Sequence, residues 1–419
     1  MQRKRYAVVG AGGRGIGMFA KPIMSDFKDT AELVALVDNN PIRMAYGASR
    51  LPGPVSQYTD FDRMMKECDP DCVIAATRDC FHADYVVKAL KAGKRAYSEK
   101  PLCTTAAQCR AILAAAKSSG QVMLTTHNAR YGAGNRAVKE VIKSGRLGDI
   151  LHMQYEETLD RRHGADYFRR WHRNKANSGG LQIHKASHHF DLLNWWAGSK
   201  PVTLAAQGGL RFYGRNGPFR GRRCLGCKHA KKCAFYAPMY DFEEYRKAYL
   251  EAEKADGYIR DGCVFDKSID IEDQLAVQYT YANGIQVNYS LVAYSPIETH
   301  RVVIEGTKGR LEAYGLYNTG WAISSTTLQG LDKLTGESVK LYIPNGGVED
   351  VSLKRVAGGH GGADPQLRAD FFGRDWKKPA NEMMASLDQA VQAVLIGCAI
   401  NKSLATGKPV DVQGLLKKD

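Results

Sequence analysis

The sequence lacks any run of eighteen consecutive apolar residues, which is roughly the shortest length that spans a membrane as a helix. It also lacks an apolar signal region, because the polar and basic residues 1–5 lead directly into a short apolar run. Membrane insertion and secretion are therefore not expected. Ten cysteines without a secretory signal indicate reduced thiols and a cytoplasmic location.

The 419 residues also contain no basic tail, internal repeat, low-complexity tract or recognised nucleic-acid-reading module, although the formal net charge is +15 and the pI is about 9.2. Because the basic residues are scattered along the chain, we expect some attraction for anionic small ligands and no nucleic-acid partner. The length suits two domains, and a hydrophobic content of 44% can fill their cores.

A glycine-rich loop follows the first apolar run, residues 6–9, without a spacer and precedes a segment that can be helical from Ile16. This order of strand, loop and helix is what a dinucleotide-binding fingerprint requires. Gly10 allows the tight turn, Gly12 lets the backbone approach a pyrophosphate, and Gly15 permits close packing of the helix. The residues predicted to bind the cofactor phosphates are Gly10, Gly12, Gly13, Arg14 and Gly15.

A second apolar run, residues 33–37, ends in Asp38 at roughly the spacing of the acid that binds the ribose hydroxyls. An aspartate there repels a 2′-phosphate, so NAD is favoured over NADP, although Arg43 could partly offset that repulsion. The alternative is that Asp38 merely caps the next helix, ahead of Pro41.

Two further apolar runs, residues 72–77 and 95–98, alternate with helical patterns at residues 83–92 and 106–118. This α/β alternation predicts a doubly wound parallel sheet, in an N-terminal Rossmann domain over residues 1–126. Ligands gather at the carboxyl ends of such strands, so we expect Thr77, His82, Glu99 and Lys100 to contact the cofactor. Lys100, in Glu99-Lys100-Pro101, would lie where a nicotinamide and a substrate meet.

A cluster of ionisable residues at positions 184–191 includes His184, Lys185, His188 and Asp191. On a helix, His184, His188 and Asp191 would face one way. A histidine that titrates near neutrality can accept the proton of an alcohol that gives up hydride, which makes His188 the candidate base. Lys100 would hold the hydroxyl oxygen and stabilise the developing alkoxide. The alternatives are core histidines of an amphipathic helix, or a metal site on His184 and His188.

The glycine loop, Glu99-Lys100-Pro101 and the 184–191 cluster together resemble the Gfo/Idh/MocA family, the glucose-fructose oxidoreductase and inositol dehydrogenase group, over nearly the whole length. The resemblance implies that Lys100 contacts the reacting hydroxyl and that His188 is the catalytic histidine, followed by Asp191. The chain departs from the family pattern at His184, where most relatives have aspartate, and Lys185 adds a second basic group. We expect His184 and Lys185 to tune the site or to bind substrate.

After about residue 126 the alternation ends, which predicts a substrate-binding and oligomerisation α+β domain over residues 127–419. Turns at residues 282–284 and 306–309 indicate hairpins in a large, mostly antiparallel sheet. The resemblance implies that this sheet meets a partner subunit, in a homodimer or homotetramer. Strands are expected at residues 150–158, 202–208, 274–281, 285–292, 301–305 and 310–313, and a C-terminal helix at residues 381–404.

Several side chains are candidates for binding a carbohydrate, because aromatic rings suit the C–H face of a sugar while Arg, His and Asp hydrogen-bond its hydroxyls. They are Arg162, His163, Tyr167, Arg170, Trp171, Asp191 and His360. The family resemblance adds Arg130 and Tyr131, because residues 127–131 are similar to the family's crossover segment, which helps to line the substrate cleft. Alternatively, Arg130 and Tyr131 cap a helix over residues 135–144, residues 161–173 form a solvated loop, and His360 belongs to a mobile surface loop.

Four cysteines, Cys224, Cys227, Cys233 and Cys263, fall in an insertion over residues 214–266 whose composition offers little core of its own. In a reduced compartment this set favours a tetrahedral structural zinc site over disulfides, with His229 as a substitute ligand. Unpaired cysteines and an iron–sulfur cluster are the alternatives.

Together these features predict an NAD-dependent dehydrogenase that takes hydride from a secondary hydroxyl of a sugar or glycoside, by family analogy at C3, to give a keto-sugar. One alternative is a redox-assisted glycosidase with tightly bound NAD. Others are a non-catalytic NAD-sensing protein and a zinc-dependent interaction module.

Overall fold

The computed structural model describes residues 3–317, 336–373, 375–376 and 380–417. The chain forms two compact units. Unit 1 comprises Met1–Tyr131, Met239–Arg260 and Ala357–Val394, and unit 2 comprises Gly132–Pro238, Asp261–Val356 and Leu395–Asp419. The domain boundary after residue 126 stays a prediction, because unit 1 also takes in two later segments of the chain.

Unit 1 contains a six-stranded sheet in the order β3-β2-β1-β4-β5-β6, in which every neighbouring pair is parallel. This order is that of the Rossmann fold, so the predicted doubly wound sheet is confirmed. Its central strands are buried apolar runs, as expected where helices cover both faces. The strands are β1 (Lys4–Val9), β2 (Ala31–Val37), β3 (Ser56–Tyr58), β4 (Cys72–Ala75), β5 (Arg95–Ser98) and β6 (Met123–Thr125).

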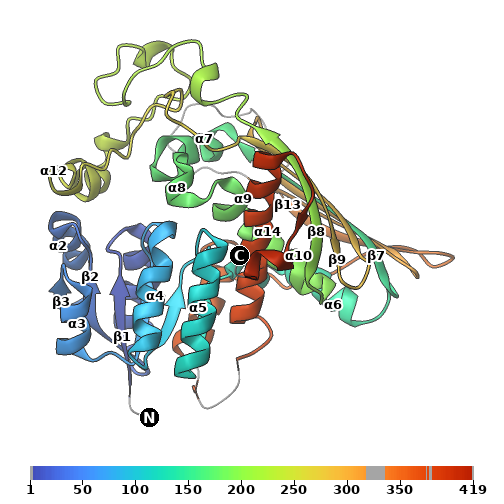
Figure 1. Cartoon of the computed structure of the whole chain (residues 1–419), viewed down its shortest axis with the longest axis horizontal. Helices are drawn as coiled ribbons and strands as arrows, with labels where there is room; N and C mark the ends of the chain where they lie inside the picture. Colours follow the sequence, from blue (N-terminus) through green and yellow to red (C-terminus); the bar gives the residue numbers. More distant parts are fainter. Residues whose placement is uncertain (1–2, 318–335, 374, 377–379, 418–419) are drawn as a thin grey trace. The chain divides into compact units, whose positions relative to one another are not determined.

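Helices flank the parallel strands of unit 1 (Figure 1). A π-helical stretch, Gly15–Ala20, leads from the glycine-rich loop into the first α-helix. A late helix, α13, packs on the sheet through aromatic contacts, with the Tyr97 and Phe371 ring centroids 4.6 Å apart. The helices are α1 (Lys21–Met24), α2 (Pro41–Ser49), α3 (Phe61–Cys68), α4 (His82–Lys91), α5 (Ala106–Ser119), α11 (Glu243–Tyr245), α12 (Glu253–Asp256) and α13 (Ala363–Phe372).

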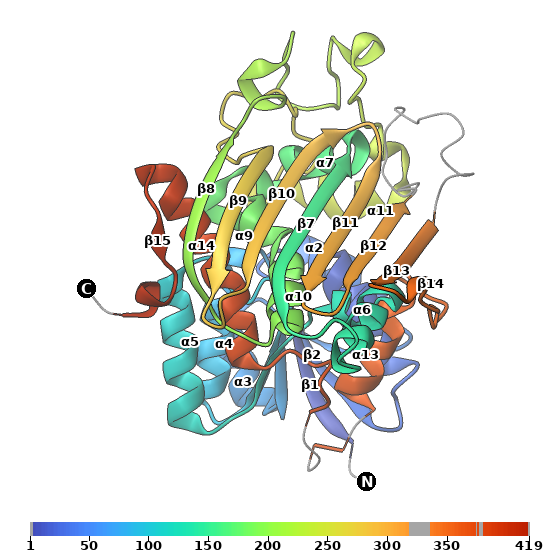
Figure 2. The ribbon, with the colours of Figure 1, turned by 90° about the vertical axis from the view of Figure 1, so that its right-hand side faces the viewer.

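Unit 2 contains a nine-stranded sheet in the order β14-β13-β12-β11-β7-β10-β9-β8-β15, shown face-on in Figure 2. Only the β10–β7 pair is parallel in the part of the chain that the structure describes, so the predicted mostly antiparallel sheet is confirmed. Both predicted hairpins, β9–β10 and β11–β12, form. The strands are β7 (Ile150–Asp160), β8 (Pro201–Gly209), β9 (Gln274–Tyr281), β10 (Gln286–Ser295), β11 (Glu298–Gly306), β12 (Arg310–Tyr317), β13 (Gly336–Ile343), β14 (Gly347–Asp350) and β15 (Val410–Asp411).

One face of the nine-stranded sheet is buried, and β9 and β10 alternate between buried and more exposed residues. Helix α7 packs against this sheet, so residues 161–169 are helical and the solvated-loop alternative is wrong for them. The helices of unit 2 are α6 (Ala133–Lys143), α7 (Arg161–Arg169), α8 (Lys175–Ser178), α9 (Leu181–His184) and α10 (Ser187–Ala197).

The last helix, α14 (Leu387–Thr406), begins later than the predicted residue 381. The side chain of Asn381 accepts hydrogen bonds from the backbone N–H groups of Met383 and Met384, which holds a turn in place of the first helical residues. The Ser386 hydroxyl then accepts from the Gln389 N–H, as an N-cap does. Among the described residues, no helix is both long enough and apolar enough to cross a membrane.

Candidate functional site

The glycine-rich loop of unit 1 has the shape that the fingerprint predicts. Gly10 adopts φ +108°, and a Cβ atom there would lie 2.4 Å from the Ala76 carbonyl oxygen. A Cβ atom on Gly15 would lie 1.8 Å from the Gly10 carbonyl oxygen, so neither position tolerates a side chain. A Cβ atom on Gly12 or Gly13 would meet nothing within 4 Å. The backbone at Gly12 and Gly13 is therefore open to a ligand, and the loop fits a dinucleotide pyrophosphate.

Asp38, at the end of β2, belongs to the same loop. Its Oδ2 accepts a hydrogen bond of 2.8 Å from the Ala11 N–H, and its Oδ1 accepts one of 2.8 Å from the Asn40 N–H. The cap of α2 is Asn40, whose side chain accepts from the Ile42 and Arg43 N–H groups. The alternative that Asp38 caps this helix is therefore wrong, while its ribose-binding role stays a prediction.

The segment Met239–Arg260 returns to unit 1 and binds the residues around Asp38. The Asn40 side-chain amide donates to the Ala252 carbonyl oxygen at 2.8 Å. Arg43 pairs with Asp256 at 2.7 Å and lies 3.6 Å from Asp38. The sequence alone predicts a possible effect of Arg43 and does not identify Asp256 as its partner. Two carboxylates thus lie close to the one guanidinium of Arg43.

Glu99 connects the glycine-rich loop with Lys100. Its Oε1 accepts from the Arg14 Nε–H at 2.8 Å, and its Oε2 accepts from the Lys100 N–H at 2.9 Å. Burial opposes the charge on Glu99, but Arg14 and Lys100 outweigh it and lower the pKa of the carboxyl group. Glu99 therefore remains a carboxylate that holds the backbone of Lys100 beside the loop, and the peptide bond from Lys100 to Pro101 is cis.

His82 is buried and bridges the ends of two strands. Its Nδ1 lies 2.8 Å from the Pro101 carbonyl oxygen, and its Nε2 lies 3.3 Å from the Thr77 carbonyl oxygen. Burial lowers the pKa of the imidazole. His82 is thus placed to hold Thr77 and the residues after β5 in position, and direct contact with the cofactor stays a prediction for both His82 and Thr77.

Asp364, which is not among the predicted site residues, is the centre of a second carboxylate network in unit 1. It accepts from Asn128 at 2.7 Å, lies 2.7 Å from His360 Nδ1, and lies 3.6 Å from Arg14. Burial opposes its ionisation, but His360 and Arg14 lower its pKa to about 2. His360, predicted to bind substrate, is therefore linked through Asp364 to the nucleotide loop.

Arg130 and Tyr131, the other predicted substrate residues of unit 1, are both buried. Arg130 donates to the Gln389 side chain at 3.1 Å, and Tyr131 donates to Asp370 at 2.6 Å. The N-cap of α6 is Gly132, so the alternative that these two side chains cap this helix is wrong. Their contacts join the residues after β6 to the late segments of unit 1.

In unit 2, Glu157 pairs with Lys185 at 3.1 Å and lies 3.5 Å from His189 Nε2. Burial and the neighbouring Glu298 raise the pKa of Glu157 to about 7, although Lys185 acts to lower it. Glu157 and Glu298 raise the pKa of Lys185 against the effect of burial, so the lysine stays protonated. Glu157 is not among the predicted site residues, although strict alternation along β7 places it on the buried side with Met153 and Tyr155.

A second chain of ionisable groups runs through α7. His163 Nδ1 lies 2.9 Å from Glu298, and His163 Nε2 lies 2.8 Å from the Tyr167 hydroxyl. Burial opposes the charge on Glu298, but His163 and Lys185 lower the pKa of its carboxyl group. Burial raises the pKa of Tyr167 to about 12. Glutamate, imidazole and phenol are thus arranged to pass or hold a proton.

His184 lies among aromatic rings. Its ring centroid is 4.1 Å from that of His172, 5.4 Å from that of Tyr167 and 5.6 Å from that of Trp171. His184 is the last residue of α9, and α10 begins only at Ser187. The prediction that one helix carries both His184 and His188 is therefore wrong.

The remaining predicted substrate residues of unit 2 have local partners. Arg162 lies 3.3 Å from Asp160, Arg170 lies 3.3 Å from Asp166, and Asp191 is fully buried. Substrate contacts for these residues stay predictions.

The predicted zinc site is not supported. No group of three or more His, Cys, Asp or Glu side chains is arranged to hold a metal ion in residues 3–317, 336–373, 375–376 and 380–417. This also leaves the alternative of a metal on His184 and His188 without support. The four cysteines nevertheless line one small cavity in unit 2.

Comparison with known proteins agrees with this geometry. The sequence matches the NAD-binding Rossmann fold of an oxidoreductase family over residues 4–127 and the C-terminal alpha/beta domain of that family over residues 139–412. A Bacillus subtilis (strain 168) protein named as an oxidoreductase, YteT, is 33% identical over 433 residues, with 99% of each chain covered.

Two further relatives have named activities. Inositol 2-dehydrogenase of Rhizobium meliloti (strain 1021) is 28% identical over 207 residues, which is 48% of this chain and 57% of that protein. A solved structure of levoglucosan dehydrogenase with NADH and L-sorbose has a TM-score of 0.69, covering 99% of this chain and 100% of that one. At 18% identity, the latter shows the fold alone. Because the two family domains span most of the sequence and one relative matches nearly end to end, the chain belongs to the Gfo/Idh/MocA family of NAD-binding oxidoreductases.

Proposed function

We propose that this oxidoreductase oxidises a secondary hydroxyl of a sugar or glycoside, with C3 as the proposed carbon, to give a keto-sugar. The observation that carries the proposal is the position of Glu99, which binds Arg14 of the nucleotide loop and the backbone of Lys100 with the same carboxylate. Glu99 thereby holds the backbone of Lys100, which follows it in sequence, beside the nucleotide loop. Relatives named for inositol and levoglucosan dehydrogenases support a polyol or sugar as the substrate.

In the proposed reaction, NAD supplies the hydride acceptor when it is bound. Lys100 donates hydrogen bonds to the hydroxyl oxygen and stabilises the negative charge that develops on it. His188 accepts the hydroxyl proton as the hydride leaves the carbon. The alcohol thus loses one proton and one hydride, and becomes a ketone. Lys185, His184 and the groups around them set the local charge.

The proposal is tested with the full chain, NAD and a panel of myo-inositol, levoglucosan, free aldoses and methyl glycosides. We expect NADH to form with at least one of them. A substrate deuterated at the reacting carbon should pass its deuterium to the nicotinamide and slow the reaction. Oxidation that leaves that deuterium in the sugar product would contradict direct hydride transfer.

The pairs around Arg43 support NAD over NADP as the cofactor. Asp256→Asn should free the Arg43 guanidinium to meet a 2′-phosphate, so the Kd for NADP should fall by about tenfold while the Kd for NAD changes little. Isothermal titration of both nucleotides measures this change. Asp241→Asn, at an exposed position of the same segment, is the matched control. Equal Kd values for NADP in the wild type and the Asp256 variant would mean that Arg43 does not face the phosphate.

A second candidate function is a redox-assisted glycosidase, in which NAD stays bound and the hydride returns to the sugar. It needs a second group that removes a proton from carbon, and the Glu298–His163–Tyr167 chain offers one. Release of nitrophenol from nitrophenyl glycosides without net NADH would favour this candidate. Release of NADH in proportion to keto-sugar would favour the dehydrogenase.

We also propose a homodimer or homotetramer formed through the exposed face of the nine-stranded sheet. This face presents polar side chains at the alternate exposed positions of β10, including Gln286 and Asn288. Light scattering of the purified chain should therefore give a mass of two or four subunits, and a monomer at all concentrations would contradict the proposal.

A further inference from the structure

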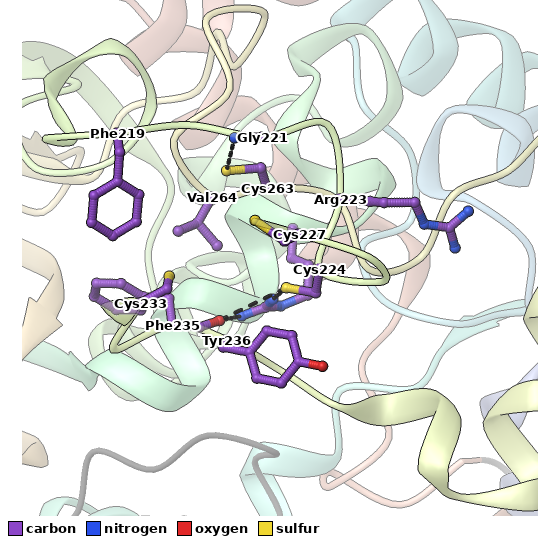
Figure 3. Close-up of a pocket in the computed structure, with 11 residues that line it drawn as sticks. Phe219, Gly221, Arg223, Cys224, Cys227, Cys233, Phe235, Tyr236, Cys263 and Val264 are labelled. Atoms are coloured by element: carbon purple, nitrogen blue, oxygen red, sulfur yellow. Dashed lines mark hydrogen bonds between the residues drawn. The ribbon is translucent and has the colours of Figure 1, made fainter. Parts of the chain in front are cut away.

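The predicted insertion over residues 214–266 is divided between the two units. Its four cysteines line the small cavity of unit 2 (Figure 3), whereas its middle part, Met239–Arg260, belongs to unit 1. We call this middle part the returning segment. All of its residues are described, and only Met239, Tyr240 and Ala252 among them are buried. Because the returning segment has almost no core of its own, its position depends on the residues of unit 1 that it meets.

The first contact of the returning segment is beside Asp38, at the carboxyl end of β2. The Asn40 side chain donates to the Ala252 carbonyl oxygen at 2.8 Å, and both residues are fully buried. The Asn40 N–H in turn donates to Asp38 Oδ1. Because a buried amide that loses its partner is costly, this hydrogen bond holds the returning segment beside the acid that is predicted to bind the ribose.

The second contact is at the carboxyl end of β4. The Arg78 guanidinium carbon lies 5.2 Å from the centroid of the Tyr258 ring, which is within the range of a cation–π contact. Arg78 is half-buried. A guanidinium is planar and has two flat sides, so Arg78 can keep Tyr258 on one side and stack on a second aromatic ring with the other.

Neighbouring side chains of the returning segment hold Tyr258 in place. The Tyr258 N–H donates to Asp256 Oδ1 at 3.0 Å. The Tyr249 ring lies edge-on to the Tyr258 ring, with centroids 6.3 Å apart. The Arg260 guanidinium carbon lies 4.2 Å from the Tyr249 centroid. Tyr258 therefore meets Arg78 as part of a packed group of aromatic and basic side chains.

The two contacts lie at the strands on either side of the glycine-rich loop. That loop follows β1, and β2 and β4 are the neighbours of β1 in the sheet. In a Rossmann fold the dinucleotide binds at the carboxyl ends of these strands, with the adenosine ribose at the acid after the second strand. Because the returning segment contacts both strand ends, it is placed along the adenosine half of the predicted cofactor site.

We propose that the returning segment forms one wall of the adenosine-binding site, and that Arg78, held by Tyr258, is the surface on which the adenine ring stacks. This proposal rests on the proposed use of NAD. Stacking on a guanidinium requires an aromatic base, so it contributes alike to the binding of NAD, NADH and ADP-ribose. Nicotinamide mononucleotide has no adenine and gains nothing from it.

The test measures binding of nucleotides to the full chain, without any sugar. Tyr258→Ala and Arg78→Met should each raise the Kd for ADP-ribose by about tenfold, as expected for loss of a stacking contact shielded from water. Both variants should also release NADH faster in stopped-flow fluorescence. The Kd for nicotinamide mononucleotide should stay the same. Tyr314→Ala, at an exposed position of β12 in unit 2, is the matched control and should bind every nucleotide as the wild type does.

Two conservative variants separate stacking from charge and from folding. Tyr258→Phe keeps the ring and should bind ADP-ribose nearly as well as the wild type. Arg78→Lys keeps the charge but loses the planar group, so it should bind ADP-ribose as weakly as Arg78→Met. Thermal unfolding without nucleotide shows that each variant is folded.

An unchanged Kd for ADP-ribose in Tyr258→Ala would overturn the proposal, as would an equal loss of binding for nicotinamide mononucleotide. Weaker binding of ADP-ribose by these variants, in a chain that oxidises no sugar, would support the adenosine site and contradict the proposed function alone.

Discussion

Lys100→Met should reduce kcat by about 100- to 1,000-fold, which is the usual effect of removing one donor that stabilises a developing oxyanion. The reason lies in the position of Lys100 next to Glu99, which the nucleotide loop holds through Arg14. Methionine keeps the length and the apolar stem of lysine, so the loss is one of charge and hydrogen bonding. Initial rates of NADH formation on the best sugar of the panel measure the effect.

The control for this variant is Lys91→Met, at an exposed position near the end of α4. It removes one positive charge from the same unit and should leave kcat within about twofold, as is usual for surface substitutions. The Kd for NAD should change little in either variant, because the glycine loop is expected to supply most of the phosphate contacts. Full turnover of the Lys100 variant would show that another group holds the hydroxyl.

The strands and the glycine loop could be predicted because their signals are local. Residues 72–75 form a buried strand and are a continuous apolar run, and Gly10 and Gly15 occupy positions where a Cβ atom would collide with backbone. Such features depend on neighbours within a few residues. Strand β3 has no such local signal, because Ser56–Tyr58 is short, mostly exposed and carries no apolar pattern, and it was therefore not predicted.

The carboxylates that complete the site could not be predicted in the same way. Asp364 meets Arg14 across 350 positions of sequence, and Asp256 meets Arg43 across 213. Only the folded chain brings these pairs together, and nothing near Asp364 or Asp256 distinguishes them from solvent-exposed acids. The family resemblance identified Lys100 and the 184–191 cluster, but it carried no information on residues outside the motifs.

Glu157 is the exception, because a local signal was available. It follows Met153 and Tyr155 at alternate positions of β7, on the side of the strand that is buried. A carboxylate at such a position is rare unless a cation or another partner meets it. Lys185 and His189 are those partners, and Glu298 adds a second negative charge to the network.

Lys185→Met should therefore destabilise the protein by about 3–5 kcal/mol at pH 8, because it leaves Glu157 buried without its main counter-charge. The pKa of Glu157 in the folded protein is about 7, above its ordinary value of 4.5, so the folded state holds this proton more tightly than the unfolded state. The contribution of Glu157 to stability is thus greatest below pH 4.5 and falls as the pH rises through 7. Without Lys185 the pKa of Glu157 rises further, so its contribution to stability continues to fall above pH 7.

Urea unfolding at pH 5 and pH 8 measures this difference. At pH 5 the carboxyl group of Glu157 is largely protonated in the folded protein, so the deficit of the Lys185 variant should shrink. Lys340→Met is the control, since Lys340 pairs with Asp350 at 3.2 Å on the surface of unit 2 and should contribute less than about 1 kcal/mol at either pH. If the Lys185 variant lost equal stability at both pH values, the loss would come from packing, and the charge of Glu157 would not be its cause.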